Sequence, residues 1–224
     1  MRLLHWILDL LFPRKCALCR TLLSKEETDY CRECRIKAPR FPVLQKKEHP
    51  SGKSKLQFLD SVTAVWYYKE NVREAILRLK FQKAAFLADP LGRSLAAKVL
   101  ETHSEGVDLL TWVPVSAKRK RRRGYDQAEL LAKVVGKELG IPAVSLLQKR
   151  KDNPAQSGMS GEARKANVLR VYQIKANTDL SGKRILLIDD VFTTGATAEE
   201  CAKVLLEGGA KAVSCAVVAT SQKE

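Results

Sequence analysis

Apolar and polar positions follow two periods along the chain, and from about residue 60 onward they predict strands and helices in alternation. Apolar runs of strand length occupy 61–68, 109–115, 141–147, 184–188 and 211–220. Apolar residues at helical spacing lie over 72–79, 126–139 and 198–207. This alternation predicts an α/β fold with a mostly parallel sheet flanked by helices, and such sheets bind ligands at the carboxyl ends of their strands.

Capping residues mark the ends of the predicted helices. Asn71 and Asp126 each precede a Glu by three positions, which is the spacing of a capping box. The pair 89–90, Asp followed by Pro, predicts a further helix start. Gly140 and the two glycines at 208–209 follow the last apolar turn of two helices and predict where these helices end.

The chain carries a large surplus of positive charge. Its 224 residues contain 40 Lys and Arg against 25 Asp and Glu, a formal net charge of +15. Because six cations are consecutive at 118–123, we expect a polyanionic partner such as nucleic acid, a phosphorylated ligand or an anionic membrane. A basic protein without such a partner is the alternative.

Composition divides the chain into three parts. Residues 1–40 contain an apolar stretch and four of the six cysteines, 41–59 are rich in Pro, Lys, Ser and Gly and predict a linker, and 60–224 form the α/β domain. The apolar stretch 1–12 is too short to span a bilayer, and no small-residue cleavage site follows it. It predicts a short amphipathic helix packed on the domain, with a membrane-surface contact as the alternative, in a cytoplasmic protein without a transmembrane segment.

The four cysteines near the amino terminus form two C-x-x-C pairs. Cys16, Cys19, Cys31 and Cys34 can place four thiolates around Zn²⁺, which predicts a closed, structural zinc site. Disulfides or a redox C-x-x-C pair are the alternatives, but thiols stay reduced in a cytosolic protein and a redox pair needs no duplication. The two remaining cysteines, at 201 and 215, fall in helix and strand patterns and predict buried apolar positions.

Two adjacent carboxylates end the apolar run 184–188 and precede a turn rich in Thr. Backbone N–H groups at the start of the helix after such a turn attract a phosphate. Gly195 allows close backbone approach, and the neighbouring hydroxyls add donors. Asp189 and Asp190 repel phosphate and instead suit ribose hydroxyls or a Mg²⁺ that carries pyrophosphate. The alternative is an N-capping loop with two solvated aspartates.

The segment 185–197, ILLIDDVFTTGAT, resembles the motif of type I phosphoribosyltransferases that binds 5-phosphoribosyl-1-pyrophosphate (PRPP). The resemblance implies that Asp189 and Asp190 bind the ribose and are catalytic candidates. It also implies that the following loop cradles the 5′-phosphate through Thr193, Thr194, Gly195, Ala196 and Thr197.

The basic run 118–123 directly follows the predicted strand 109–115. In phosphoribosyltransferases a loop at this place contacts pyrophosphate, so the resemblance makes Arg122, Arg123 and Lys118 candidates for pyrophosphate or nucleic acid and Arg123 a catalytic candidate. The run can also hold nucleic acid by its phosphates, and Tyr125 can add a stacking surface or lie at the edge of the core. A solvated loop is the alternative.

A long polar stretch, 150–167, lies between two predicted strands. The resemblance implies a flexible loop here that closes over the substrate, with Gln156, Arg164 and Asn167 as its candidate residues. A disordered connector is the alternative.

Taken together, the cysteine module and the stretches LRLKFQ, VPVSAKRKRRRGYDQA, NPAQSGMSGEARKAN and IDDVFTTGAT resemble the ComF family of bacterial competence proteins, the ComFC type in particular. The resemblance implies a factor for DNA uptake and natural transformation that acts near a helicase-like partner and single-stranded DNA. Ser116 departs from the family, in which many members have Pro at this place, and we expect only a slightly looser turn.

Three functions follow from these patterns. The first is a competence factor that binds single-stranded DNA and uses PRPP, or a related sugar phosphate, with Mg²⁺. The second is a metabolic phosphoribosyltransferase that salvages a base, for which no base-recognition pocket is identifiable in the sequence. The third is a DNA-binding adaptor with an inactive sugar site, against which the intact pair of acids argues.

Overall fold

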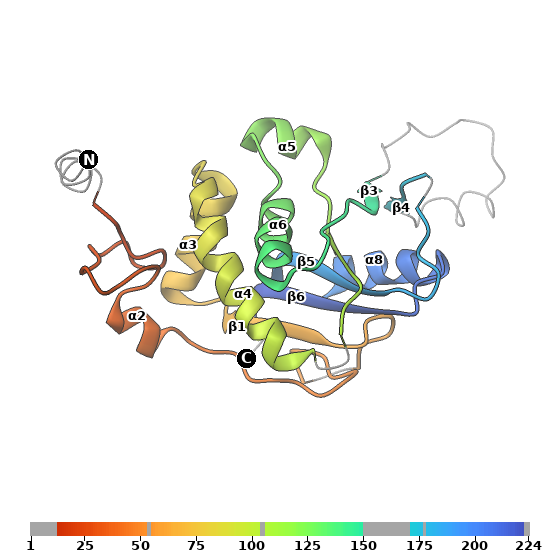
Figure 1. The fold of residues 1–224 in the computed structure, drawn as a ribbon, viewed down its shortest axis with the longest axis horizontal. Coiled ribbons are helices and arrows are strands. Elements are labelled where there is room, and N and C mark those ends of the chain that lie inside the picture. Colours follow the sequence, from red (N-terminus) through yellow and green to blue (C-terminus); the bar gives the residue numbers. More distant parts are fainter. Residues whose placement is uncertain (1–12, 53–54, 104–105, 150–170, 177, 222–224) are drawn as a thin grey trace.

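A parallel sheet forms the centre of the protein in the computed structural model, which describes residues 13–52, 55–103, 106–149, 171–176 and 178–221 (Figure 1). Its four strands lie in the order β1-β6-β5-β2, and each neighbouring pair is parallel. The strands are β1 (Val62–Tyr67), β2 (Leu109–Trp112), β5 (Arg184–Phe192) and β6 (Ala212–Thr220). The predicted α/β fold with a parallel sheet is therefore confirmed.

Helices cover both faces of this sheet because the apolar side chains of its strands alternate between them. On β5, Leu186 and Ile188 join the core beneath α3, α4 and α6, whereas Ile185 and Leu187 join the core beneath α8. The helices are α3 (Glu70–Phe81), α4 (Ala88–Thr102), α6 (Gln127–Leu139) and α8 (Ala196–Glu207). The remaining elements are α2 (Arg32–Lys37), the 3₁₀ turn η1 (Ala85–Leu87), α5 (Ala117–Arg123), β3 (Leu147–Lys149) and β4 (Tyr172–Ile174).

One predicted strand, 141–147, is wrong. The structure has a single bridge there, between Ala143 and Leu110, and β3 begins only at Leu147, where it pairs antiparallel with β4. Pro142 lacks the N–H that a continuous ladder needs, so only its carbonyl takes part, accepting from the N–H of Leu110.

The helix starts are confirmed at one of three places. Asp126 caps α6 by accepting from the N–H groups of Ala128 and Glu129. The prediction for Asn71 is wrong, because α3 already begins at Glu70 and its N-cap residue is Lys69. The prediction for Asp89 is also wrong, because α4 continues out of the 3₁₀ turn η1 and begins at Ala88. The predicted helix ends are confirmed, with Gly140 and Gly208 as C-cap residues.

The segment 41–59, for which the sequence predicts a linker, packs on the α8 face of the sheet. Phe41, Leu56 and Leu59 are buried in the core beneath α8. The carboxylate of Glu199 on α8 accepts from three successive backbone N–H groups, at 57–59. These contacts hold the segment beside the amino terminus of α8.

The cysteine-containing part, 13–40, packs on α3 and α4 (Figure 1). The buried guanidinium of Arg78 on α3 donates to the carbonyls of Ala17 and Leu18 at 2.6 and 2.7 Å. The hydroxyl of Tyr30 donates to the carbonyl of Pro90 on α4 at a distance of 2.7 Å. The division of the chain into a module, a linker and a domain stays a prediction.

Candidate functional site

The acid pair lies at the carboxyl end of β5, and its two side chains belong to opposite faces of the sheet. Strand alternation places Asp190 on the face of Leu186 and Ile188, which α3 covers, and Asp189 on the face that α8 covers. The two carboxylates therefore have different neighbours, although they are adjacent in sequence.

Asp190 is paired with a lysine that sequence reasoning missed. Its side chain is only 4% exposed, and its Oδ1 lies 2.8 Å from the Nζ of Lys80 on α3. The other oxygen, Oδ2, is buried without a hydrogen-bond partner among the described residues. A buried carboxylate oxygen without a donor is costly, so this atom is a natural acceptor for a ligand hydroxyl or a metal ion. Lys80 lies in the stretch LRLKFQ, and the resemblance of this stretch to the ComF family was the signal in the sequence that could have identified Lys80 as a site residue.

The electrostatic environment of Asp189 differs from that of Asp190. Burial, followed by the charge of Asp190, raises the pKa of Asp189 well above its ordinary value of 3.8. Its Oδ1 accepts from the N–H of Asp190 at 2.8 Å, and Lys80 favours its charged form. The pair thus shares one cation, and a divalent cation would relieve the repulsion between the two carboxylates.

The turn between β5 and α8 presents the start of a twelve-residue helix. Gly195 has a φ of 79°, and a Cβ at this position would overlap the ring of Phe192, so only glycine fits. The N-cap residue of α8 is Gly195, which has no side chain to cap the helix, and the N–H of Ala196 makes one long hydrogen bond, 3.4 Å, to the hydroxyl of Thr194. The backbone N–H groups that follow in the first turn are available to a phosphate. The residues around this glycine, Thr193, Thr194, Ala196 and Thr197, are exposed.

His49, a second residue that sequence reasoning missed, contacts this turn. Its Nε2 lies 3.2 Å from the carbonyl oxygen of Thr194, and its ring packs edge-on against Phe192 at 5.4 Å. His49 belongs to the segment 41–59, so the packing of this segment brings it beside a turn that is distant in sequence. Composition alone gave no signal for this contact.

The basic run forms the helix α5 and not a loop. Ser116 caps it by accepting from the N–H of Arg119, and Gly124 ends it with a φ of 86°. The hydroxyl of Ser116 makes a cap that Pro lacks, and the expected loosening of the turn stays a prediction. Cations in the last turn also interact favourably with the helix dipole.

The segment that leads from β2 to α5 leaves the sheet next to the acid pair, because β2 and β5 are neighbours. Trp112 pairs with Ile188, and the N–H of Val113 donates to the carbonyl of Ile188 at 3.0 Å. Lys118 and Arg122 are exposed on α5. Within the described residues, one ion pair involves this helix, between Lys120 and Glu129 at 2.7 Å.

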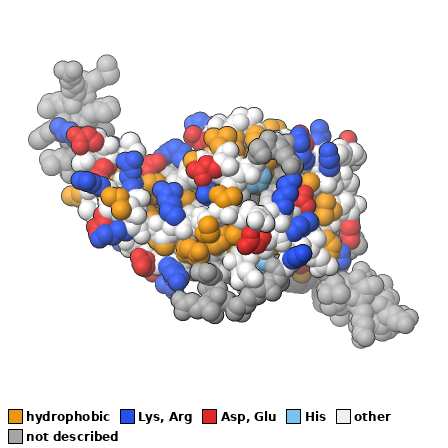
Figure 2. All heavy atoms as spheres, turned by 90° about the horizontal axis from the view of Figure 1, so that it is seen from below, with side chains coloured by type: hydrophobic (Ala, Val, Ile, Leu, Met, Phe, Trp, Pro, Cys, Tyr) orange, Lys and Arg blue, Asp and Glu red, His pale blue; other side chains and the backbone are white. Residues whose placement is uncertain are grey.

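The cations of α5 are consecutive, whereas on the face seen from below Lys and Arg are interspersed with Asp and Glu (Figure 2). A cavity of about 860 Å³ beside α5 adds Lys149 and Lys175 to the cations of this helix, and Asp126 and Glu129 also line it. Together, α5 and this cavity form a basic surface beside the carboxyl end of β2.

Arg123 is less exposed than the rest of the run and is fixed in place. Its Nη1 donates to Oε1 of Gln127 at 2.6 Å, and its guanidinium lies over the ring of Phe81, 4.9 Å from the centroid. Phe81 follows Lys80 on α3, so Arg123 and Asp190 contact consecutive residues at the carboxyl end of this helix. Tyr125 lies at the edge of the core, where its hydroxyl donates to the carbonyl of Leu79 at 2.6 Å.

Gln156, Arg164 and Asn167, the candidates in the polar stretch, lie outside the described residues. The described strands β3 and β4 flank this stretch and pair with each other.

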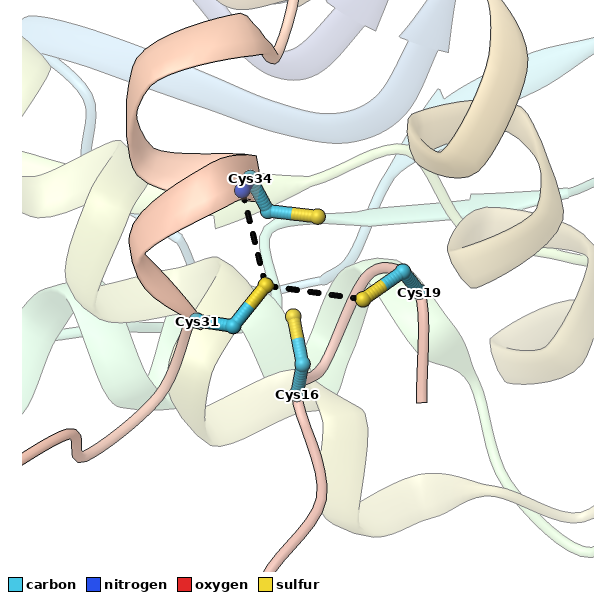
Figure 3. A group of neighbouring side chains, drawn as sticks. All are labelled: Cys16, Cys19, Cys31 and Cys34. Atoms are coloured by element: carbon cyan, nitrogen blue, oxygen red, sulfur yellow. Dashed lines mark hydrogen bonds between the residues drawn. The ribbon is translucent and has the colours of Figure 1, made fainter. Parts of the chain in front are cut away.

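The four cysteines of the two C-x-x-C pairs lie together, and their sulfur atoms point toward one another (Figure 3). All four lie within 4.8 Å of one another, and the Sγ atoms of Cys19 and Cys31 are 3.6 Å apart. Tetrahedral Zn²⁺ with Zn–S bonds of about 2.3 Å requires sulfur separations of about 3.8 Å. The group can therefore hold a metal ion of this size.

The surroundings of this group also suit thiolates around a cation. Burial raises the pKa of Cys31 and of Cys34, so charged thiolates at these two positions are unfavourable without a positive ion, whereas hydrogen bonds from Thr21 help to lower the pKa of Cys19 to about 6. The side-chain amide of Asn71, which lies inside α3, is 4.0 Å from the Sγ of Cys34. Cys201 and Cys215 are fully buried, as predicted.

Helices of the described ranges include none that is both long and apolar enough to cross a membrane.

The carboxyl-terminal part of the chain matches a known family. Residues 123–224 match the phosphoribosyl transferase domain. This part of the chain is therefore similar to a phosphoribosyltransferase domain; it contains the acid pair at the end of β5, and a four-cysteine group at 16–34 precedes it.

Similarity to particular proteins extends over nearly the whole chain. Competence protein F of Haemophilus influenzae is 29% identical over 90% of this chain and 95% of its own length. DNA utilization protein YhgH of Escherichia coli is 27% identical over 90% and 94%, and competence protein ComFC of Bacillus subtilis is 29% identical over 65% and 58%. The chain is thus a homologue of competence protein F and ComFC, which confirms the resemblance seen in the sequence.

Among solved structures, glutamine PRPP amidotransferase of Bacillus subtilis, complexed with ADP and GMP, is similar with a TM-score of 0.43. It is 23% identical and matches 59% of this chain and 26% of its own, so the chain spans about a quarter of that protein.

Proposed function

We propose that the protein acts in DNA uptake or DNA use and that it binds PRPP, or a related sugar phosphate, together with Mg²⁺ at the β5–α8 turn. One observation carries the sugar-phosphate site: an acid pair and a helix start with glycine at its N-cap lie at the same end of β5. The helix start suits a phosphate, and the carboxylates suit ribose hydroxyls or Mg²⁺.

In this proposal, the two acids have separate roles because they have separate neighbours. Asp190, with its free Oδ2 and its fixed partner Lys80, accepts from a ribose hydroxyl or binds the cation. Asp189 joins it when a cation lowers the cost of a second charge. Arg123 binds the pyrophosphate in this proposal, which its contact with Phe81 at the end of α3 supports by fixing the guanidinium.

Single-stranded DNA is the proposed second partner, and its phosphates lie along the basic surface of α5. The surplus of positive charge, its concentration on α5 and the names of the relatives support this part. We further propose a structural zinc ion at the four cysteines, a cytoplasmic location and a helicase-like competence partner.

If the protein catalyses a reaction, we propose pentosyl transfer, in which pyrophosphate leaves under Mg²⁺ and Arg123. The alternative function, salvage of a free base, shares the sugar-phosphate site. A screen of purines, pyrimidines and nicotinate with labelled PRPP separates the two, since robust turnover on a free base supports salvage.

Oligonucleotide binding across a salt series tests the DNA part of the proposal. We expect the logarithm of affinity to fall linearly with the logarithm of salt concentration, with a slope of about −0.7 per phosphate contacted. Replacing Arg121 and Arg122 on α5 by Gln should weaken binding and reduce the slope by about 0.7 for each phosphate that the variant no longer neutralises.

The exposed Lys137 on α6 provides the matched control, because Lys137→Gln removes a positive charge from another helix. We expect this variant to keep the wild-type slope. A wild-type affinity that does not change with salt would contradict the DNA part.

A further inference from the structure

An exposed aromatic ring stands at the carboxyl end of α3. Phe81 is the last residue of this helix, and 58% of it is exposed to solvent. Solvent exposure of a large aromatic residue forgoes the stabilisation that burial would give. A ligand that covers the ring would account for its exposed position.

The ring is held in a fixed pairing with a cation. The guanidinium of Arg123 lies 4.9 Å from the centroid of Phe81, and Gln127 fixes the same guanidinium through a 2.6 Å hydrogen bond. The hydroxyl of Tyr125 donates to the carbonyl of Leu79 and so ties the loop after α5 to the end of α3. The aromatic ring and the guanidinium are thus preorganised on two elements that are joined at this point.

This pair lies between the two surfaces that the proposed function uses. On one side, Lys80 precedes the ring and reaches Asp190 of the acid pair at 2.8 Å. On the other side, Arg123 is the last residue of α5, whose other cations are exposed. A strand whose phosphates follow α5 would bring its bases to the ring.

We infer that Phe81 and Arg123 form a stacking platform for a base of single-stranded DNA. The inference rests on the DNA part of the proposed function and deepens it. Every base has a π-face, so an aromatic ring and a guanidinium plane bind bases without sequence preference, whereas a duplex keeps its bases stacked on each other. The phosphates supply the salt-dependent part of the affinity, and the platform supplies a part that depends on the base.

An abasic oligonucleotide separates these two parts, since it keeps the phosphates and lacks the bases. We propose fluorescence anisotropy with oligothymidylate of about 15 nucleotides and with an abasic strand of equal length, a length within the usual footprint of single-strand binders. Wild-type protein should bind the thymidylate strand more tightly. Phe81→Leu should weaken binding of thymidylate at least about fivefold and leave the abasic strand unchanged.

Two further variants keep the test specific. Phe81→Trp retains a π-face and should bind thymidylate like the wild type. Leu100→Ala removes an apolar side chain that is more exposed than Phe81 from the last turn of α4 and should change neither affinity. Circular dichroism and thermal melting check that each variant is folded.

The outcomes separate this inference from the proposed function. If the wild type binds neither strand, the DNA part of the proposed function fails. If the wild type binds both strands, and Phe81→Leu binds each strand with the affinity of the wild type, the stacking platform is wrong. The proposal of a basic DNA-binding surface on α5 is then unaffected. Equal loss on both strands would show that Phe81 only positions Arg123 for phosphate, which also overturns the platform.

Discussion

At the scale of single residues, the acid pair shows how adjacent positions acquire different properties. Asp189 and Asp190 belong to opposite faces of β5, and only Asp190 has a lysine in direct contact. The pKa of Asp189 is raised by burial and by the neighbouring charge. Ligand binding at this place should therefore involve a proton.

We predict that affinity for PRPP with Mg²⁺ falls as pH decreases through the raised pKa of Asp189. The bound cation needs the charged carboxylate, so protonation competes with the ligand at pH values where an ordinary aspartate is already ionised. The same shift makes the ligand-free protein less stable as pH rises, because the folded state binds this proton more tightly than the unfolded state.

Titration calorimetry between about pH 5 and 8, in two buffers of different ionisation enthalpy, measures both the affinity and the proton released. Asp189→Asn should bind weakly and lose this pH dependence. An affinity of the wild type that stays constant over the range, with no proton release, would contradict the assignment.

Sequence reasoning was able to reach the acids and the glycine of this site, but not their partners. The order of residues 189–197 specifies a strand end, a turn and a helix start, and these are local properties. Lys80 and His49 reach the same place from α3 and from the segment 41–59, and such contacts depend on tertiary packing that no local pattern encodes.

At the scale of elements, α3 connects the cysteine group with the acid pair. Asn71 and Arg78 contact the cysteine-containing part, while Lys80 and Phe81 contact the candidate site at the end of the same helix. A rigid helix that is held on both sides should respond when one side is released.

We predict that removal of metal by a chelator destabilises the cysteine-containing part 13–40 first and then the amides of α3. The guanidinium of Arg78 depends on the carbonyls of Ala17 and Leu18, which lie between the first two cysteines. Hydrogen exchange should show faster exchange in α3 and unchanged protection in β6. Equal protection of α3 with and without metal would contradict the connection.

Arg78→Met isolates this contact and should lower the free energy of unfolding by about 1–3 kcal/mol, because two buried carbonyls lose a charged donor. Arg73→Met on the same helix is the control, since Arg73 is exposed and pairs only with the neighbouring Glu74 in the described structure.

The basic run 118–123 forms the helix α5, whereas the sequence analysis expected a loop. Repulsion among six consecutive cations favours a loop in isolation, yet Ser116 and Gly124 cap the two ends, and Lys120 pairs with Glu129 on α6. Lys and Arg have high helix propensity, so capping and one cross-helix pair suffice.

At the scale of the whole molecule, the parallel sheet places the candidate ligand-binding residues at the edge where its strands end. The carboxyl ends of β2 and β5 are neighbours, which brings the segment that leads into the basic helix α5 next to the acid pair although about 70 residues separate them. The alternation of strands and helices predicted ligand binding at the carboxyl ends of strands, but the order of the strands comes from the structure. The packing of 41–59 on the α8 face was not predictable, because this segment has no periodic apolar pattern.

The central claim is that the acid pair and the β5–α8 turn form a sugar-phosphate site, and titration of PRPP with Mg²⁺ into wild type and Asp190→Asn tests it most directly. We expect wild-type binding that requires Mg²⁺ and a loss of about 10- to 100-fold in the variant, with the melting temperature showing an intact fold. Asp89→Asn, an exposed aspartate on α4, should bind like the wild type. Equal affinity of wild type and Asp190→Asn would contradict the assignment of the site.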